Sequence, residues 1–172
     1  MFKDAGLKYL IFGPAGAGKT SISNELRNRN IWSIDDDHFG LWYDSTDNIV
    51  HNYLGTQEWR ESHKYLWDLK ALAQILQPYE TVYFTGISTN TLDALPLFDK
   101  SFFLHATVDT YCQRLTNDDR KTNYPILELP EYEKFIKNHL EIVLPIIKER
   151  GCIFIDAEQP LNKVVEDILD RS

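Results

Sequence analysis

The sequence contains few cysteines, an excess of acidic over basic side chains, and no long apolar run. Its two cysteines, Cys112 and Cys152, show neither metal-binding nor redox spacing, so we expect small core residues rather than a disulfide or metal site. Lys and Arg number 18 against 26 Asp and Glu, which gives a formal net charge of −8. Proteins that grip nucleic-acid backbones need a basic face, so this balance argues against a nucleic-acid partner.

Membrane and secretion signals are also missing from the sequence. No charged-then-apolar leader opens it, and no apolar run approaches the roughly 20 residues that a membrane span requires. We therefore expect a cytoplasmic protein without a membrane partner. A length of 172 residues suits a single domain covering residues 1–172. As to assembly, we expect a monomer or a homodimer.

Short apolar runs alternate with amphipathic segments of helical length. This alternation is typical of an α/β fold, in which helices cover both faces of a parallel sheet. Each predicted strand is short, apolar and rich in β-branched or aromatic residues. The five predicted strands cover residues 7–12, 31–34, 81–85, 101–105 and 152–155.

The helical segments follow from spacing and from proline. One helix begins near Gly18, and a long one over 57–77 repeats leucine at helical spacing until Pro78 stops it. Pro145 is expected to kink or divide another. The remaining predicted helices cover 92–98, 110–116, 132–149 and 161–169. Two stretches, 39–55 and 117–130, look irregular, and long loops in a compact domain are usually lids or binding segments.

The strongest motif directly follows the first predicted strand. Residues 13–20 complete the pattern G-x-x-x-x-G-K-[ST], a Walker A phosphate-binding loop, whose backbone N–H groups surround an anion. Lys19 would reach the β and γ phosphates, and the Thr20 hydroxyl would hold Mg²⁺. The alternative is a chance glycine-rich turn. The predicted nucleotide contacts are Gly13, Pro14, Ala15, Gly16, Ala17, Gly18, Lys19, Thr20 and Ser21.

Three consecutive carboxylates, Asp35, Asp36 and Asp37, follow the second predicted strand. Open α/β sheets bind ligands at this end of their strands. The period of two places Asp35 and Asp37 on one side of the chain and Asp36 on the other. We assign Asp37 to orient an acceptor hydroxyl and Asp35 to the metal shell. A helix N-cap or a solvated acidic turn is the alternative.

Arg60 is the candidate anion clamp on the acceptor side, because arginine recognises a carboxylate or phosphate in a planar, bidentate way. A surface arginine paired with Glu61 is the alternative. The aromatic residues around it either line a pocket for a ring-bearing acceptor or pack as helix core. They are Trp42, Tyr43, Tyr53, Trp59, Tyr65 and Trp67.

Other candidates lie in the second half of the chain. Arg114 can lie flat on a purine. In the polar stretch after it, Arg120, or else Lys121, is the candidate lid cation that offsets charge in the transition state; a solvated charged loop is the alternative. The backbone of residues 156–160 leaves the last strand as a turn that can contact an adenine edge.

Together these motifs resemble the P-loop nucleoside monophosphate kinase superfamily, and most closely its shikimate kinase-like branch. The resemblance implies a three-layer α/β/α P-loop NTPase fold with strand order 2-3-1-4-5. It assigns acceptor binding to Asp37, Trp59, Arg60 and Gly86, adenine stacking to Arg114, and the adenine loop to residues 156–160, including Asp156, Ala157 and Pro160. It also implies an acceptor-binding insertion over about 38–78 and a lid over about 117–130.

The same resemblance implies an ATP- and Mg²⁺-dependent kinase that acts on a small acceptor. The chain departs from shikimate kinases in Thr85-Gly86-Ile87-Ser88, where they carry three glycines, and in Tyr124-Pro125, where they carry Arg-Pro. Its acceptor therefore stays open between a polyol or hydroxy acid and a nucleoside or nucleotide. A nucleotide-binding regulatory module without phosphotransfer is the hypothesis from another class.

Overall fold

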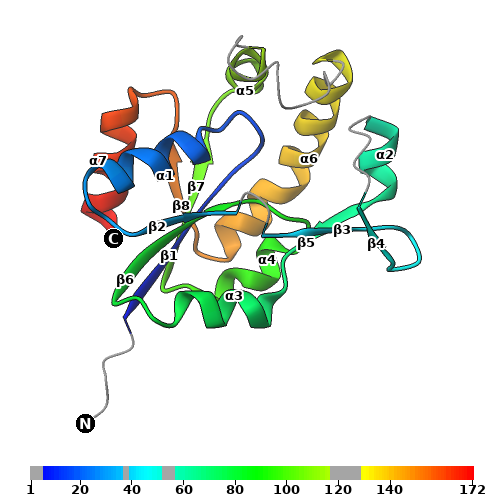
Figure 1. The fold of residues 1–172 in the computed structure, drawn as a ribbon. Coiled ribbons are helices and arrows are strands. Elements are labelled where there is room, and N and C mark those ends of the chain that lie inside the picture. The colour runs from blue at the N-terminus through cyan, green and yellow to red at the C-terminus, as the bar shows by residue number, and fades with distance from the viewer. Residues whose placement is uncertain (1–5, 37–38, 52–56, 117–128) are drawn as a thin grey trace.

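The molecule is built around a twisted sheet of parallel strands, shown in Figure 1. The structure, a computed structural model, describes residues 6–36, 39–51, 57–116 and 129–172. In spatial order the five strands are β2 (Ser33–Asp35), β6 (Thr81–Gly86), β1 (Leu7–Phe12), β7 (Lys100–His105) and β8 (Ile153–Asp156). Numbered among themselves along the chain, these strands have the order 2-3-1-4-5, which confirms the expected topology.

Helices cover both faces of this sheet. α1 (Lys19–Asn28) and α7 (Leu161–Arg171) lie side by side on one face (Figure 1). α3 (Leu69–Leu76), α4 (Thr91–Ala94) and α6 (Leu129–Glu149) lie on the other side. The central strands are buried on both faces, as parallel strands between helix layers must be, and this explains their continuous apolar runs. The expected three-layer α/β/α architecture is therefore confirmed.

The prediction of one long helix over 57–77 is wrong. The segment forms α2 (Gln57–Ser62), the strand β5 (Lys64–Leu66) and then α3. The helix cannot continue because β5 pairs antiparallel with β3 (Leu41–Tyr43). The Asp68 carboxylate accepts hydrogen bonds from Lys70 N and Ala71 N and so begins a new helix.

The stretch 39–55 was expected to be irregular, and this expectation is also wrong. It contains β3 and β4 (Ile49–Val50), which form a small antiparallel sheet with β5 in the order β4-β3-β5. The turn between β3 and β4 is closed by the Asp44 carboxylate, which accepts from Thr46 N and Asn48 N. We call the described residues 39–51 and 57–66 the β2–α3 insertion. In Figure 1 it projects to the right of the main sheet.

The other elements differ from expectation mainly at their ends. The predicted helix 92–98 forms α4 followed by a 3-10 turn over Leu95–Leu97, and α5 covers Val108–Leu115. Pro145 lies inside α6 without dividing it. Cys112 and Cys152 are half-buried free thiols, and burial raises the pKa of each. None of the helices in the described ranges is long and apolar enough to cross a membrane.

Candidate nucleotide and acceptor site

The glycine-rich loop between β1 and α1 has a backbone that other side chains cannot adopt easily. Gly16 and Gly18 have φ angles of 85° and 95°, in the left-handed region that favours glycine. A Cβ atom on Gly16 would also lie 2.3 Å from the carbonyl oxygen of Tyr111. The loop leads into the first turn of α1, where backbone N–H groups lack helical partners and favour an anion.

Lys19 lies over this loop. Its Nζ donates to Gly13 O at 2.8 Å and to Pro14 O at 2.9 Å, so the positive charge is held beside the N–H groups of the loop. Thr20 and Ser21 follow in the first turn of α1. The predicted phosphate-binding residues 13–21 therefore come together as one loop and helix start.

Two tyrosines support the loop from the side of α5 and α6. Tyr111 is fully buried, and its main chain packs against Gly16. The Tyr132 hydroxyl on α6 donates to Ala15 O at 2.9 Å. Burial raises the pKa of Tyr132 well above its usual value, and the charge of Arg60 acts in the opposite direction.

The acidic end of β2 lies at the same edge of the sheet. Asp35 is half-buried, while Asp36 is buried and turned into the protein. The Asp36 Oδ2 atom accepts from Ile87 N and from Trp67 Nε1, both at 3.1 Å. Burial raises the pKa of Asp36 to about 6, and the charge of Lys19 lowers it. Asp36 was the carboxylate of the three given no role from the sequence, and its contacts depend on residues far along the chain.

The predicted acceptor residues come from two separate elements. Trp59 on α2 is buried, stacks on His63 at 4.0 Å between ring centroids, and meets Trp42 edge-on at 4.8 Å. Arg60 is half-buried beside it. Gly86 ends β6, where a Cβ atom would lie 2.4 Å from Asp36 Cγ. The aromatic residues Trp42, Trp59 and Tyr65 thus pack within the insertion and not along one long helix.

A cavity of about 430 Å³ opens next to the glycine-rich loop. Arg114 and Ala157, both predicted at the adenine site, line it together with Gly16–Gly18 and Gln159. The Arg114 Nη2 atom donates to Ala157 O at 2.6 Å, which fixes the guanidinium at the wall. The structure therefore brings the predicted base contacts and the phosphate loop into one continuous site.

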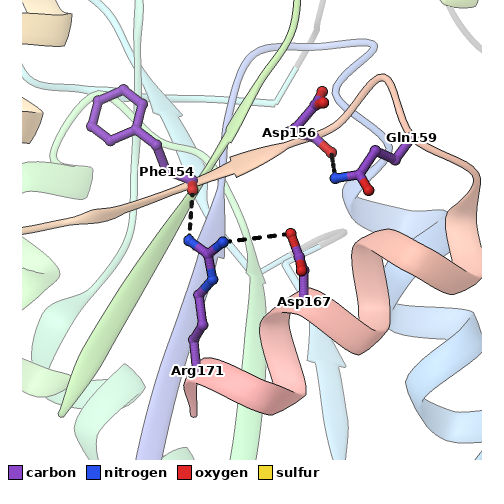
Figure 2. A network of polar contacts seen from close by, with 5 residues as sticks. All are labelled: Phe154, Asp156, Gln159, Asp167 and Arg171. Carbon is purple, nitrogen blue, oxygen red and sulfur yellow. Dashed lines mark hydrogen bonds and ion pairs between the residues drawn. The ribbon is translucent and has the colours of Figure 1, made fainter.

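The turn over 156–160 is tied at several points. The Glu158 carboxylate accepts from Thr107 N and from the hydroxyls of Thr107 and Thr110, and these bonds lower the pKa of Glu158 to about 2. Gln159 Nε2 donates to Asp156 O at 3.4 Å (Figure 2). Arg171 of α7 donates to Phe154 O of β8 at 3.4 Å and forms an ion pair with Asp167. Asp156 and Pro160 are exposed at the ends of the turn. Glu158 and Gln159 lie within the predicted adenine turn, but no role was predicted for either side chain.

Several predicted residues fall outside the described residues. They are Asp37, Tyr53, the candidate lid cations Arg120 and Lys121, Tyr124 and Pro125, together with the predicted lid up to residue 128. Within the described ranges, no group of three or more His, Cys, Asp and Glu side chains is arranged to hold a metal ion.

The sequence matches no protein-family model, and no curated protein is similar to it at a significant level. Solved structures are similar over nearly the whole chain. A shikimate kinase from Acinetobacter baumannii in complex with shikimate has a TM-score of 0.59 at 19% identity, covering 96% of this chain and 92% of that one. A deoxyadenosine kinase from M. mycoides with bound dATP has a TM-score of 0.60 at 16% identity, covering 96% and 98%.

A gluconokinase from Sinorhizobium meliloti has a TM-score of 0.56 at 16% identity, covering 94% of this chain and 89% of that one. All three neighbours are kinases with the P-loop nucleoside monophosphate kinase-like fold, so the resemblance drawn from the motifs is confirmed at the level of the fold. At 16–19% sequence identity, the similarity establishes the fold and does not identify the acceptor.

Proposed function

We propose that this protein is an ATP-dependent kinase that transfers the γ-phosphate of ATP to a hydroxyl or phosphate of a small acceptor. The observation that carries the proposal is the position of Lys19, which lies over a complete phosphate-binding loop and also acts electrostatically on the acidic end of β2. A donor phosphate and an acceptor group can therefore meet at one cation.

ATP is the proposed donor. Its base would enter the cavity that Arg114 and Ala157 line, and its triphosphate would follow the loop toward Lys19. The guanidinium plane of Arg114 suits stacking on a purine. The continuity between the cavity and the loop supports this orientation of the nucleotide.

The site also suits Mg²⁺ bound together with the nucleotide. Thr20 and Asp35 offer a hydroxyl and a carboxylate, the hard oxygen ligands that Mg²⁺ prefers, and phosphates commonly complete its shell. Two protein ligands are few for a resident ion, which agrees with a metal that arrives with ATP. When bound, Mg²⁺ would neutralise part of the charge on the transferred group.

The proposed transfer is in line. Asp37 orients the acceptor hydroxyl and accepts its proton, while Lys19 and the lid cation, Arg120 or Lys121, stabilise charge on the transferred group. Trp59, Arg60 and Gly86 form the acceptor side, with Arg60 holding an anionic group. The proposed partners are thus ATP, its product ADP and a small molecule, and the proposed assembly is a monomer or a homodimer.

The acceptor class has two candidates that the structure favours for different reasons. Arg60 suits the carboxylate of a hydroxy acid, whereas the Trp42 and Trp59 rings beside it suit the base of a nucleoside. The neighbours include kinases named for shikimate, gluconate and deoxyadenosine. We therefore test the first reading against a nucleoside or nucleotide kinase as the second.

The decisive measurement is ADP release from MgATP with and without shikimate, gluconate, deoxyadenosine and deoxycytidine monophosphate. A kinase gives release that one acceptor stimulates and that Lys19→Ala abolishes. Tight MgATP binding with no stimulation by any of the four favours a nucleotide-binding regulatory module instead. Absence of MgATP binding in calorimetry contradicts both readings.

A further inference from the structure

The two ends of the β2–α3 insertion lie close together where they join the main sheet. We call this junction the neck; it consists of Asp36, Phe39, Gly40, Tyr65, Trp67, Gly86 and Ile87. Asp36 follows β2 just before the insertion, and Trp67 follows β5 just after it. The indole Nε1 of Trp67 donates to Asp36 Oδ2 at 3.1 Å, and Ile87 N, after β6, donates to the same oxygen at 3.1 Å. One carboxylate therefore joins the entry of the insertion, its exit and the end of a central strand.

A second set of contacts closes the same neck. The Tyr65 hydroxyl of β5 donates to Asp36 O at 3.3 Å and accepts from Gly40 N at 2.9 Å. Phe39 N also donates to Asp36 O, at 2.8 Å. Both ends of the insertion are thus fastened to the main chain or side chain of Asp36.

The neck has no spare volume. A Cβ atom on Gly86 would lie 2.4 Å from Asp36 Cγ, and one on Gly40 would lie 2.4 Å from Tyr65 Cζ. Trp67 is 2% exposed and packs edge-on against Phe84 at 5.2 Å. Close packing on every side means that the neck holds one arrangement instead of hinging freely.

Burying a carboxylate costs free energy unless hydrogen bonds and charge offset the loss of water. Here burial raises the pKa of Asp36 to about 6, against the lowering effects of Lys19, Ile87 N and Trp67. A buried acid with these partners is a poor choice for stability alone. It is well suited to hold the insertion in a fixed relation to Lys19.

We propose that Asp36 is a positioning residue, whose carboxylate clasps the neck of the β2–α3 insertion and so sets where Trp59 and Arg60 lie relative to the phosphate-binding loop. This inference rests on the proposed function where it concerns the acceptor. Acceptor binding depends on the clasp, while nucleotide binding does not, because the loop and the base cavity are built from other elements.

The test uses the full chain with Asp36→Asn, Trp67→Phe and the double variant. Hydrogen exchange is measured for the backbone of 39–51 and 57–66 against β1, and MgADP affinity is measured by calorimetry. Each single variant should speed exchange in the insertion about tenfold or more, with β1 exchange within about twofold of wild type. MgADP affinity should stay within about twofold in Trp67→Phe, which leaves the carboxylate charge near Lys19 in place. Because the two side chains share one hydrogen bond, the effect of the double variant should be smaller than the sum of the two single effects.

Two controls separate the clasp from general loss of stability. Phe102→Leu removes core volume in β7 without touching the neck, and Trp32→Phe changes an indole that is 66% exposed. Neither should loosen the insertion selectively. Unchanged exchange in the insertion, or acceleration equal to that of β1, overturns the clasp. If Asp36→Asn does not fold, Trp67→Phe decides alone.

Kinetics give the readout that a merely structural residue would not move. With whichever of shikimate, gluconate or deoxyadenosine stimulates ADP release, Trp67→Phe should raise the KM for that acceptor about tenfold and leave the KM for ATP unchanged. Equal changes in both constants overturn the positioning role. Failure of wild type to bind MgADP counts against the proposed function, while the exchange data still decide the clasp.

Discussion

The phosphate-binding loop and the β2–α3 insertion keep their shapes by different means. The loop is set by its backbone, through left-handed glycines and a hydrogen bond from Tyr132 to Ala15 O. The insertion is set by side chains, through the Trp42 and Trp59 rings and the contacts of its neck. The backbone is common to all residues, whereas side chains differ with the sequence.

In the proposed function, the loop would bind the donor, which is the same in every phosphoryl transfer, and the insertion would bind the acceptor, which varies. Any donor presents the same phosphate groups, and backbone N–H groups recognise them without help from particular side chains. Acceptors differ in shape and charge, so in the proposed function their recognition would be the task of side chains on the insertion. A fold of this kind can change acceptors by altering the insertion while the loop stays as it is.

The largest expected effect is a loss of turnover when the cation of the phosphate-binding loop is removed. Lys19→Ala should lower turnover about 10³-fold or more, because it removes the cation that stabilises the transferred charge, while the free energy of unfolding changes little. Steady-state ADP release and urea unfolding measure the two quantities. Lys148→Ala, an exposed lysine of α6, is the matched control. Activity retained in Lys19→Ala would contradict the donor site.

A second variant pair tests the loop backbone. Gly18→Ala meets no atom within 4 Å and should cost only the left-handed backbone strain, about 1–2 kcal/mol. Gly16→Ala adds a collision with Tyr111 O and should weaken MgADP binding considerably more. Calorimetry on both variants measures the difference. Equal losses would show that the packing against α5 does not matter.

On the side of the insertion, Gly86→Ala should displace the Asp36 carboxylate at a cost of about 1–3 kcal/mol in unfolding free energy. The KM for the acceptor should rise while the KM for ATP holds. Adding Asp36→Ala removes Cγ and Oδ2 from the collision but keeps Cβ, which would lie 2.6 Å from the new methyl group, so it should recover only part of the lost stability. A loss of ATP affinity equal to the loss of acceptor affinity would erase the distinction between the two regions.

The smallest effect is a pH dependence of stability. The folded pKa of Asp36 is about 6 against 3.8 for an ordinary Asp, so the folded protein holds this proton more tightly than the unfolded chain. Its contribution to stability is then full below about pH 4 and is lost as the pH rises toward 6. Urea unfolding of wild type and Asp36→Asn should show their difference changing across this window. A constant difference would contradict the raised pKa.

The sequence predicted the main sheet and the donor side well, because their signals are local. Residues 7–12 form a strand as expected, and the loop motif fixes the turn after it. Arg114 and Ala157, which the resemblance assigns to the adenine site, lie in contact with each other, and their roles toward a nucleotide stay a prediction. The positions of these groups follow from strand order, which alternating apolar runs and the motif already indicate.

The insertion was missed because its structure depends on distant pairing. Strands β3, β4 and β5 have two or three residues each, which is too short for an alternation of apolar and polar residues to be recognised in the sequence. The leucine spacing over 66–75 favoured one helix, although Asp68 was an N-cap signal for a break. The role of Asp36 could not be read from the sequence, since its partners Trp67 and Ile87 are brought to it only by folding.

The contact between Gly86 and Asp36 has an evolutionary consequence. Because a Cβ atom at 86 would collide with the carboxylate at 36, the two positions are constrained jointly. Homologues that carry a bulkier residue at the end of β6 should have exchanged the aspartate for something smaller.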